Sequence, residues 1–368
     1  MTITLTLTIN WRIYKSNNNC MADFLQQLAE QKRKVDFNTY DMTTKELVSL
    51  VADGTINISP EYQRQFRWEE ERQSSLIESI FLGIPVPSLF MATNSDNTWE
   101  VIDGVQRLST IINFVADRDA DIRKKIKKTE PLKLRGLKKL SLFNDHTFGE
   151  LPSTIRLEFN LKPIKVITLS DKSDKLVRFD LFERLNTGGV KLSDQEIRSC
   201  VYTGDFVRFI KRLAKDENFR AVTKKPTRRE TDGTIEELVL RFFAYLYYRE
   251  SFDHNVRDFL NEFMAKGQDM DLDEMEAIFK KVFTQLRRLD HGIVKTVNGN
   301  NTSTILWEAV TVGAAEAIRS GKEQINLNGF YEWVRTPEFN KLVTGATNSK
   351  PKVEQRIEYA KQKFLRDE

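Results

Sequence analysis

The chain has 368 residues, of which 40% are hydrophobic and 30% are charged, and its net charge is +4. This composition excludes an intrinsically disordered chain, and the length is sufficient for two domains. The two cysteines, Cys20 and Cys200, exclude a disulfide framework and a cysteine-based zinc site. A reducing, cytoplasmic compartment fits this cysteine content best. No window approaches the roughly 18 apolar residues that a membrane helix needs, so we expect no membrane contact.

The first 20 residues differ from those that follow. Residues 1–10, MTITLTLTIN, alternate Thr with Ile or Leu, which is a strand pattern and not the apolar core of a signal peptide. Residues 11–20 resemble a linker, and Met21 begins a helical pattern. We therefore expect residues 1–20 to be a leader or a misassigned start.

Helical and strand patterns alternate up to about residue 200. The apolar spacing predicts helices over 43–54, 69–83, 106–117, 172–189 and 192–200. It predicts strands over 84–93, 98–103 and 164–169. This half of the chain therefore has α/β character.

The rest of the chain has helical patterns and no convincing strand. The expected helices are 204–215, 234–250, 256–265, 272–290, 303–319 and 352–366. The fold class predicted is α+β, with an α/β domain over 21–200 and an all-helical domain over 201–368. The aromatic stretch 238–250 fits either buried core or a face that docks a partner protein.

Lys and Arg are concentrated in residues 122–140, where nine of them stand against one Glu. We treat about 120–150 as a basic insertion. Its lysines could contact DNA phosphates, and the candidates are Lys124, Lys125, Lys127 and Lys128. The alternative is an ordinary solvated surface, partly packed through the apolar residues of the segment.

The first candidate site is DGVQR, residues 103–107, where a strand passes into a helix. Helix N-termini present free backbone N–H groups, and Gly104 allows close approach, so phosphate is a natural ligand. Arg107 could bind phosphate, Asp103 a metal or water, and Gln106 could orient that water. A second interpretation makes Asp103 the helix N-cap and pairs it with Arg107 one turn on.

Two further polar clusters flank this junction in the sequence. In 182–199, Asn186 and Thr187 precede Gly188 and Gly189, a turn able to approach a ligand, while Ser193 and Glu196 have capping-box spacing. Arg184 and Arg198 have no such assigned role and are freer. In 60–68, PEYQRQFRW, arginines alternate with aromatic residues, which fits either nucleotide bases or a stacked surface lid.

The three clusters together resemble the N-terminal domain of GmrSD-type modification-dependent restriction enzymes, which also occurs in phosphorothioation-sensing anti-phage proteins. The resemblance covers about residues 40–200 and implies a fold related to ParB and sulfiredoxin. The family signature DGQQR, associated with nucleoside triphosphate binding and hydrolysis, matches Asp103, Gly104, Gln106 and Arg107. Its second conserved loop matches Asn186, Thr187 and Gly188, and its N-terminal polar patch matches Gln63 and Arg64.

Two departures from the family pattern bear on activity. Val105 replaces the first Gln of the signature, which counts against hydrolysis more than against binding. Family restriction enzymes also carry a C-terminal HNH nuclease domain with clustered His and Asn around a metal. The C-terminal half has only His254 and His291, with no paired motif, so we expect a separate chain to supply any nuclease activity.

The sequence thus predicts a nucleotide-binding sensor module of a prokaryotic anti-phage or restriction system, with NTP hydrolysis an open question. A nucleoside triphosphate with Mg²⁺ would lie between the junction and the second loop, with Asp103, Gln106 and Arg107 catalytic and Asp103 the metal ligand. The other nucleotide-binding candidates are Gln63, Arg64, Arg67, Gly104, Arg184, Asn186, Thr187, Gly188 and Gly189. The alternative function is a non-catalytic module that binds DNA or protein and has a degenerate nucleotide pocket.

Overall fold

The computed structural model describes residues 23–30, 36–58, 68–94, 96–117, 119–170, 175–185, 192–202, 204–226, 232–296, 298–345 and 347–366. Two compact units divide the chain, Met1–Val190 and Lys191–Glu368. The first contains a mixed sheet with helices, and in the second the elements formed by the described residues are all helices. The predicted α+β class is confirmed. The expected leader, residues 1–20, lies outside the described residues.

The first unit contains a five-stranded sheet in the order β1-β5-β3-β4-β2. β5 pairs antiparallel with β1 and parallel with β3, while β4 pairs antiparallel with β3 and parallel with β2. The strand bounds are β1 Phe37–Thr43, β2 Ile56–Asn57, β3 Leu89–Thr93, β4 Trp99–Asp103 and β5 Pro163–Leu169. The sequence did not predict β1, whose residues are mostly polar and exposed because it is an edge strand.

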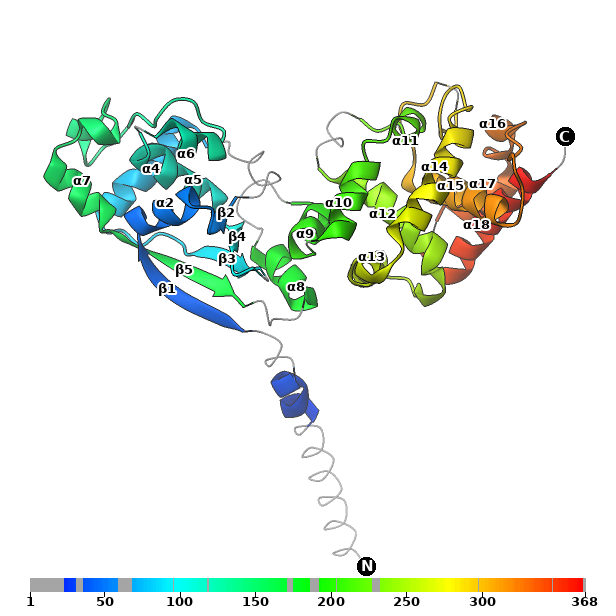
Figure 1. Cartoon of the computed structure of the whole chain (residues 1–368), viewed down its shortest axis with the longest axis horizontal. Coiled ribbons are helices and arrows are strands. Elements are labelled where there is room, and N and C mark those ends of the chain that lie inside the picture. The colour runs from blue at the N-terminus through cyan, green and yellow to red at the C-terminus, as the bar shows by residue number, and fades with distance from the viewer. Residues whose placement is uncertain are drawn as a thin grey trace, which may run out of the picture. The chain divides into compact units, whose positions relative to one another are not determined.

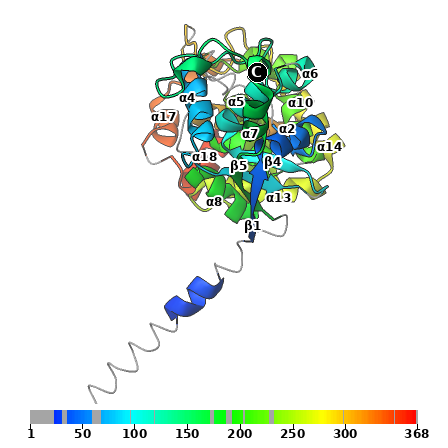
Figure 2. The same ribbon diagram turned by 90° about the vertical axis from the view of Figure 1, so that its left-hand side faces the viewer.

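Helices cover the sheet unequally. One face carries α2, α4, α5 and α7, and α8 lies on the other side (Figure 1). Figure 2, turned by 90°, shows the same arrangement. The helix bounds are α2 Thr44–Ala52, α4 Glu70–Phe81, α5 Val105–Val115, α6 Ala120–Lys125, α7 Ser153–Asn160 and α8 Lys175–Leu185.

An aromatic cluster forms the core between the helices of the first unit. Phe81 of α4 packs against Phe114 of α5 and Phe159 of α7, with ring centroids 6.3 and 4.7 Å away. Phe148 completes the cluster, with its ring centroid 5.2 Å from that of Phe114. The cluster anchors the C-terminal part of α5, and Gly104 joins the N-terminal end of this helix directly to β4.

The second unit is a helical assembly in which the long helices α12, α14, α15 and α18 enclose the core. Its helices are α9 Asp194–Val201, α10 Asp205–Leu213, α11 Glu217–Val222, α12 Thr234–Tyr247, α13 Val256–Lys266, α14 Leu272–Leu286, α15 Thr304–Arg319, α16 Phe330–Trp333, α17 Pro337–Val343 and α18 Lys350–Leu365. Helix α9 packs against α12 and α13, so the division of the chain falls before it, earlier than the expected boundary at residue 200.

The aromatic stretch 238–250 is predominantly core. Phe242, Phe243 and Tyr245 of α12 are fully buried, and Phe242 contacts Phe279 and Trp307 edge-on. The core interpretation of this stretch is therefore confirmed. Within the described residues, no helix is long and apolar enough to cross a membrane.

Candidate functional site

The DGVQR motif lies where β4 passes into α5, as the sequence predicts. Gly104 separates the two elements and is the N-cap of α5, with φ +97° in the left-handed region. A Cβ atom at this position would lie 2.5 Å from Cδ2 of the buried Leu89. The turn therefore requires glycine for two reasons, its backbone angle and the close approach of β3.

Arg107 links the start of α5 to the end of β4 and to the residue before β3. Its Nη2 donates to Asp103 Oδ2 at 2.7 Å and to the Ser88 carbonyl at 3.1 Å. The two charged side chains remain 17% and 29% exposed. The ion pair one turn on is thus confirmed, but Asp103 as the N-cap is wrong, because the cap is Gly104.

Arg107 also has an unused donor. Its Nε is buried and has no hydrogen-bond partner in the structure. A buried guanidinium N–H without an acceptor is unfavourable. The group is therefore fixed in place with part of its hydrogen-bonding capacity unfilled.

Gln106 connects the junction to Trp68, the last residue of the 60–68 cluster. The Trp68 backbone N–H donates to Gln106 Oε1 at 3.3 Å, and Gln73 Nε2 of α4 donates to the Trp68 carbonyl at 2.7 Å. Arg72 lies 4.5 Å from the Trp68 ring centroid. The sequence analysis missed Gln73 and Ser88, because nothing in the local sequence patterns indicates that they contact the junction residues.

Several predicted site residues lie outside the described part of the chain. These are Gln63, Arg64, Arg67, Asn186, Thr187, Gly188 and Gly189. The end of the 60–68 cluster is described, and Trp68 reaches the junction through Gln106. Arg184 lies at the exposed C-terminal end of α8, a helix that packs on β4.

The capping assignment in the 182–199 cluster is confirmed. Ser193 Oγ accepts from the Glu196 backbone N–H at 3.2 Å, and Glu196 Oε2 accepts from the Ser193 N–H at 2.8 Å. The interpretation of Arg198 as freer is wrong, because its side chain is only 1% exposed. It donates to Asn261 at 2.8 Å and to Glu237 at 3.0 Å.

Arg198 belongs to a buried chain of ion pairs that the sequence did not reveal. Arg241 bonds Glu237 at 2.8 Å and Glu308 at 2.7 Å, and Arg356 bonds Glu308 at 2.5 Å. Burial would raise the pKa of Glu237, but Arg241 and Arg198 hold that pKa below its usual value. This network joins α9, α12, α15 and α18.

The basic segment 122–140 is anchored in the first unit. Ile126, Leu132, Leu134 and Leu137 are buried, which confirms the predicted partial packing. Arg123 is also buried, and its Nη1 donates to the carbonyls of Ala116 and Asp117, both at 2.6 Å.

The four candidate lysines of this segment differ in their surroundings. Lys125 donates to the Val51 and Ala52 carbonyls at the end of α2, at 2.9 and 2.7 Å. Lys124 pairs with Asp121 at 2.9 Å and remains exposed. Lys127 is exposed and Lys128 is half-buried. Lys125 therefore has a structural contact, and Lys124 and Lys127 offer the more accessible charges.

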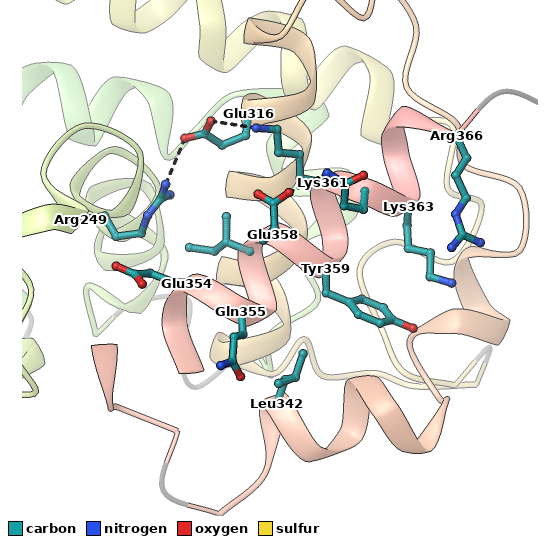
Figure 3. Close-up of a pocket in the computed structure, with 12 residues that line it drawn as sticks. Arg249, Glu316, Leu342, Glu354, Gln355, Glu358, Tyr359, Lys361, Lys363 and Arg366 are labelled. Carbon is teal, nitrogen blue, oxygen red and sulfur yellow. Dashed lines mark hydrogen bonds and ion pairs between the residues drawn. The ribbon is translucent and has the colours of Figure 1, made fainter. Parts of the chain in front are cut away.

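A groove of about 700 Å³ lies on the second unit, between α18 and its neighbours (Figure 3). Its charges are mixed, and Glu316 pairs with Arg249 at 3.4 Å and with Lys361 at 3.9 Å. None of the predicted site residues lines it. Among the described residues, no group of three or more His, Cys, Asp or Glu side chains is placed to hold a metal ion.

Comparison with known families concerns the part of the chain that contains the junction. Residues 44–203 match the model of the GmrSD restriction endonuclease N-terminal domain. This segment belongs to the GmrSD N-terminal domain family. The family predicted from the three motifs is thereby confirmed, and the domain is of a type found in restriction systems.

No match was found among curated proteins. A solved structure described as the C2221 form of a Pnob8-like ParB-N domain aligns over 89% of this chain and 96% of its own, at 10% identity. Its TM-score is 0.21, which is too low to carry a conclusion about fold or function.

Proposed function

We propose that the GmrSD-type domain binds a nucleoside triphosphate with Mg²⁺ at the Asp103–Arg107 junction and acts as the sensor module of a prokaryotic anti-phage or restriction system. The observation that carries the proposal is the start of α5, where a glycine N-cap leaves the first-turn N–H groups without a capping side chain. These groups and the positive end of the helix dipole favour a phosphate group.

The charged side chains at the junction suit the same ligand. Arg107 is held by Asp103 and Ser88 and keeps a buried Nε without an acceptor. Phosphate oxygens would accept hydrogen bonds from a fork of this kind. The side chains of Arg107 and Asp103 are 17% and 29% exposed, so a ligand at the surface can reach part of the pair.

Asp103 fits a magnesium ion that is shared with phosphate. Mg²⁺ usually takes one or two protein carboxylates together with phosphate oxygens and water, and does not need an all-protein cage. Arg107 contacts the Oδ2 atom of Asp103, and the Asp103 carboxylate would hold the ion. Mg²⁺ would neutralise phosphate charge, while Gln106 would orient water if the nucleotide is hydrolysed.

Val105 favours nucleotide binding over hydrolysis as the activity of this site. Its side chain is 6% exposed and packs into the core at the start of α5. It provides no polar group to the site where the family signature has Gln. We therefore assign binding as the primary activity and treat hydrolysis as the second quantity to measure.

The test is calorimetric titration with ATP, GTP, CTP and UTP, with and without Mg²⁺, followed by phosphate release. We expect Asp103→Asn to weaken Mg²⁺-dependent binding of the preferred nucleotide by about tenfold or more, because each lost charge-assisted contact is worth ~1.5–3 kcal/mol. Asp41→Asn is the matched control, since Asp41 is also an ion-paired carboxylate of this unit, 3.6 Å from Lys165. Failure of the native chain to bind any of the four nucleotides would overturn the proposal, as would equal affinities in the two variants.

A second candidate function is DNA binding by the basic segment. The observation in its favour is that buried leucines anchor the segment while Lys124 and Lys127 stay exposed. We expect the double variant Lys124→Ala, Lys127→Ala to reduce the slope of log affinity against log salt by about 0.9 for each lost phosphate contact. Lys165→Ala, at an exposed position of β5, is the control, and an unchanged slope in the double variant would contradict DNA contact here.

Any DNA cleavage we assign to a separate nuclease chain. The support is the histidine content of the C-terminal half, where His254 and His291 are far apart in sequence. Both are exposed, unlike the ligands of a structured HNH metal site. The purified chain alone should leave plasmid DNA intact with Mg²⁺ and nucleotide, and cleavage by it would overturn this assignment.

A further inference from the structure

The second face of the β-sheet is incompletely covered. An apolar cavity of about 200 Å³ lies on this face, lined by Phe37 of β1, Phe90 of β3, Ile102 of β4, Ile167 of β5 and Leu181 of α8. Four strands contribute to it, and α8 is the helix that borders it. Phe37 is 59% exposed, so an aromatic ring at the rim lacks cover.

A short helix with an apolar face precedes β1, the strand that supplies Phe37 to this cavity. Residues 23–30 are helical, and Phe24, Leu25 and Leu28 share one face at helical spacing. These side chains are 66%, 59% and 51% exposed. An isolated helix of this length is marginal in water, because tertiary packing of the apolar face supplies most helical stability in proteins.

The tether between the two surfaces is short. Six residues, 31–36, separate the helix from Phe37, which is both the first residue of β1 and a lining residue of the cavity. Six extended residues span at most ~20 Å, so the helix cannot move far from the cavity rim. Such a tether gives an effective concentration in the millimolar range, which favours docking within the chain over docking on a second copy.

We propose that helix 23–30 docks through Phe24, Leu25 and Leu28 onto the cavity at Phe37 and completes the second face of the sheet. The occupant is this segment of the same chain. Docking would bury the exposed Phe37 ring together with the three apolar side chains, and removing this apolar surface from water favours the docked state. The interaction involves neither the nucleotide site nor the basic segment.

The test is hydrogen–deuterium exchange of the amides of residues 27–30 in the full-length chain. These are the amides with acceptors inside the helix, since the first four N–H groups of a helix have none. We expect them to exchange at least about tenfold more slowly than in a free peptide of the same sequence, as expected for a docked element. Leu28→Asp and Phe37→Asp should each restore the free-peptide rate, because they change opposite sides of one interface.

Matched variants separate docking from general effects of charge. Gln27→Asp adds the same charge on the polar face of the helix, and Asn38→Asp adds it at the neighbouring position of β1, which points to the opposite face of the sheet. Both should leave exchange of residues 27–30 unchanged, and exchange of α5 amides should be equal in all variants, which shows that the unit remains folded.

Three results would overturn the proposal. One is a free-peptide exchange rate in the native chain. Another is protection that survives Phe37→Asp, which would place the helix on a different surface. The third is protection that disappears on tenfold dilution, which would show docking onto a second copy.

Discussion

The two units use arginine–carboxylate pairs in opposite ways. In the sheet unit, Arg107 and Asp103 lie 2.7 Å apart with side chains 17% and 29% exposed. In the helical unit, Arg356 and Glu308 lie 2.5 Å apart with side chains 0% and 1% exposed. The chemistry and the distances are alike, and the surroundings differ.

This difference separates a pair available to a ligand from one that holds a fold. Glu308 accepts hydrogen bonds from both Arg241 and Arg356. If either arginine gave up this contact for a ligand, a buried charge would lose its partner. Asp103 and Arg107 are partly exposed, so exchanging a partner costs less there than within the buried network. A functional assignment therefore fits the junction, and a structural one fits the buried network.

The largest expected effect follows from breaking the buried network. Glu308→Gln keeps the side-chain volume but removes the carboxylate charge that pairs with Arg241 and Arg356. Arg241 would keep its ion pair with Glu237, and Arg356 would keep only its hydrogen bond to the Thr347 carbonyl among the contacts described. We expect the free energy of unfolding to fall by about 3–5 kcal/mol, as for other buried pairs that lose one partner. Urea unfolding followed by circular dichroism measures this change.

A double variant tests whether the loss comes from uncompensated charge. Glu308→Met with Arg356→Met removes both members of the most buried pair, and we expect it to be less destabilised than either single Met variant. Glu358→Gln, at an exposed position of α18, controls for loss of a glutamate. If the double variant lost as much stability as the sum of the two singles, the network would not be acting as a coupled unit.

At the junction, a glycine substitution separates backbone strain from contact with β3. Gly104→Ala places a Cβ atom 2.5 Å from Leu89, whereas Gly54→Ala, at a similar φ of +85°, has nothing within 4 Å. We expect Gly54→Ala to lower the free energy of unfolding by about 1 kcal/mol, from backbone strain alone. Gly104→Ala should lower it by about 2–3 kcal/mol, because the clash with Leu89 adds to the strain.

Only the Gly104 variant should lose nucleotide affinity, since it displaces the start of α5. Thermal unfolding and nucleotide titration of the two variants measure these effects. Equal stability losses in Gly54→Ala and Gly104→Ala would show that the Leu89 side chain moves aside at no energetic cost. Unchanged affinity in Gly104→Ala would remove this turn from the site.

Much of the fold was predictable because its elements carry strong local signals. Helices such as α12 and α15 have long apolar faces, and β4 and β5 are apolar runs bounded by polar residues. β1 was missed because an exposed edge strand lacks such a run. The expected strand over 84–93 begins at Leu89, because Pro85 and Pro87 cannot donate to a ladder.

The candidate site was predictable only in part, because its motif is local and its supports are not. The sequence identified the strand–helix turn at Gly104 and the Asp103–Arg107 pair, whose members are four residues apart. The Ser88 carbonyl that holds Arg107 comes from a segment 19 residues earlier. The misjudged Arg198 shows the same limit, since its partners Glu237 and Asn261 lie 39 and 63 residues away.

The smallest expected effect concerns a pair at the surface of the helical unit. Arg212 of α10 makes a two-point contact with Glu276 of α14, at 2.6 and 2.5 Å, and Lys280 bonds the same carboxylate at 2.7 Å. These hydrogen bonds lower the pKa of Glu276 from 4.5 to about 2. Because the folded-state pKa is the lower one, the pair stabilises the fold above pH 4.5, and that contribution is lost as the pH falls toward 2.

Glu276→Gln should therefore flatten the acid limb of the stability curve between pH 4.5 and 2 and leave the slope above pH 5 unchanged. Arg212 is 58% exposed, so solvent screening limits the total effect to less than about 1 kcal/mol. Urea midpoints at pH 2, 3, 4.5 and 7 measure it, with Glu358→Gln as an exposed control. A loss of several kcal/mol at pH 7 would instead group Glu276 with Glu308, as part of the charge network that the helical fold requires.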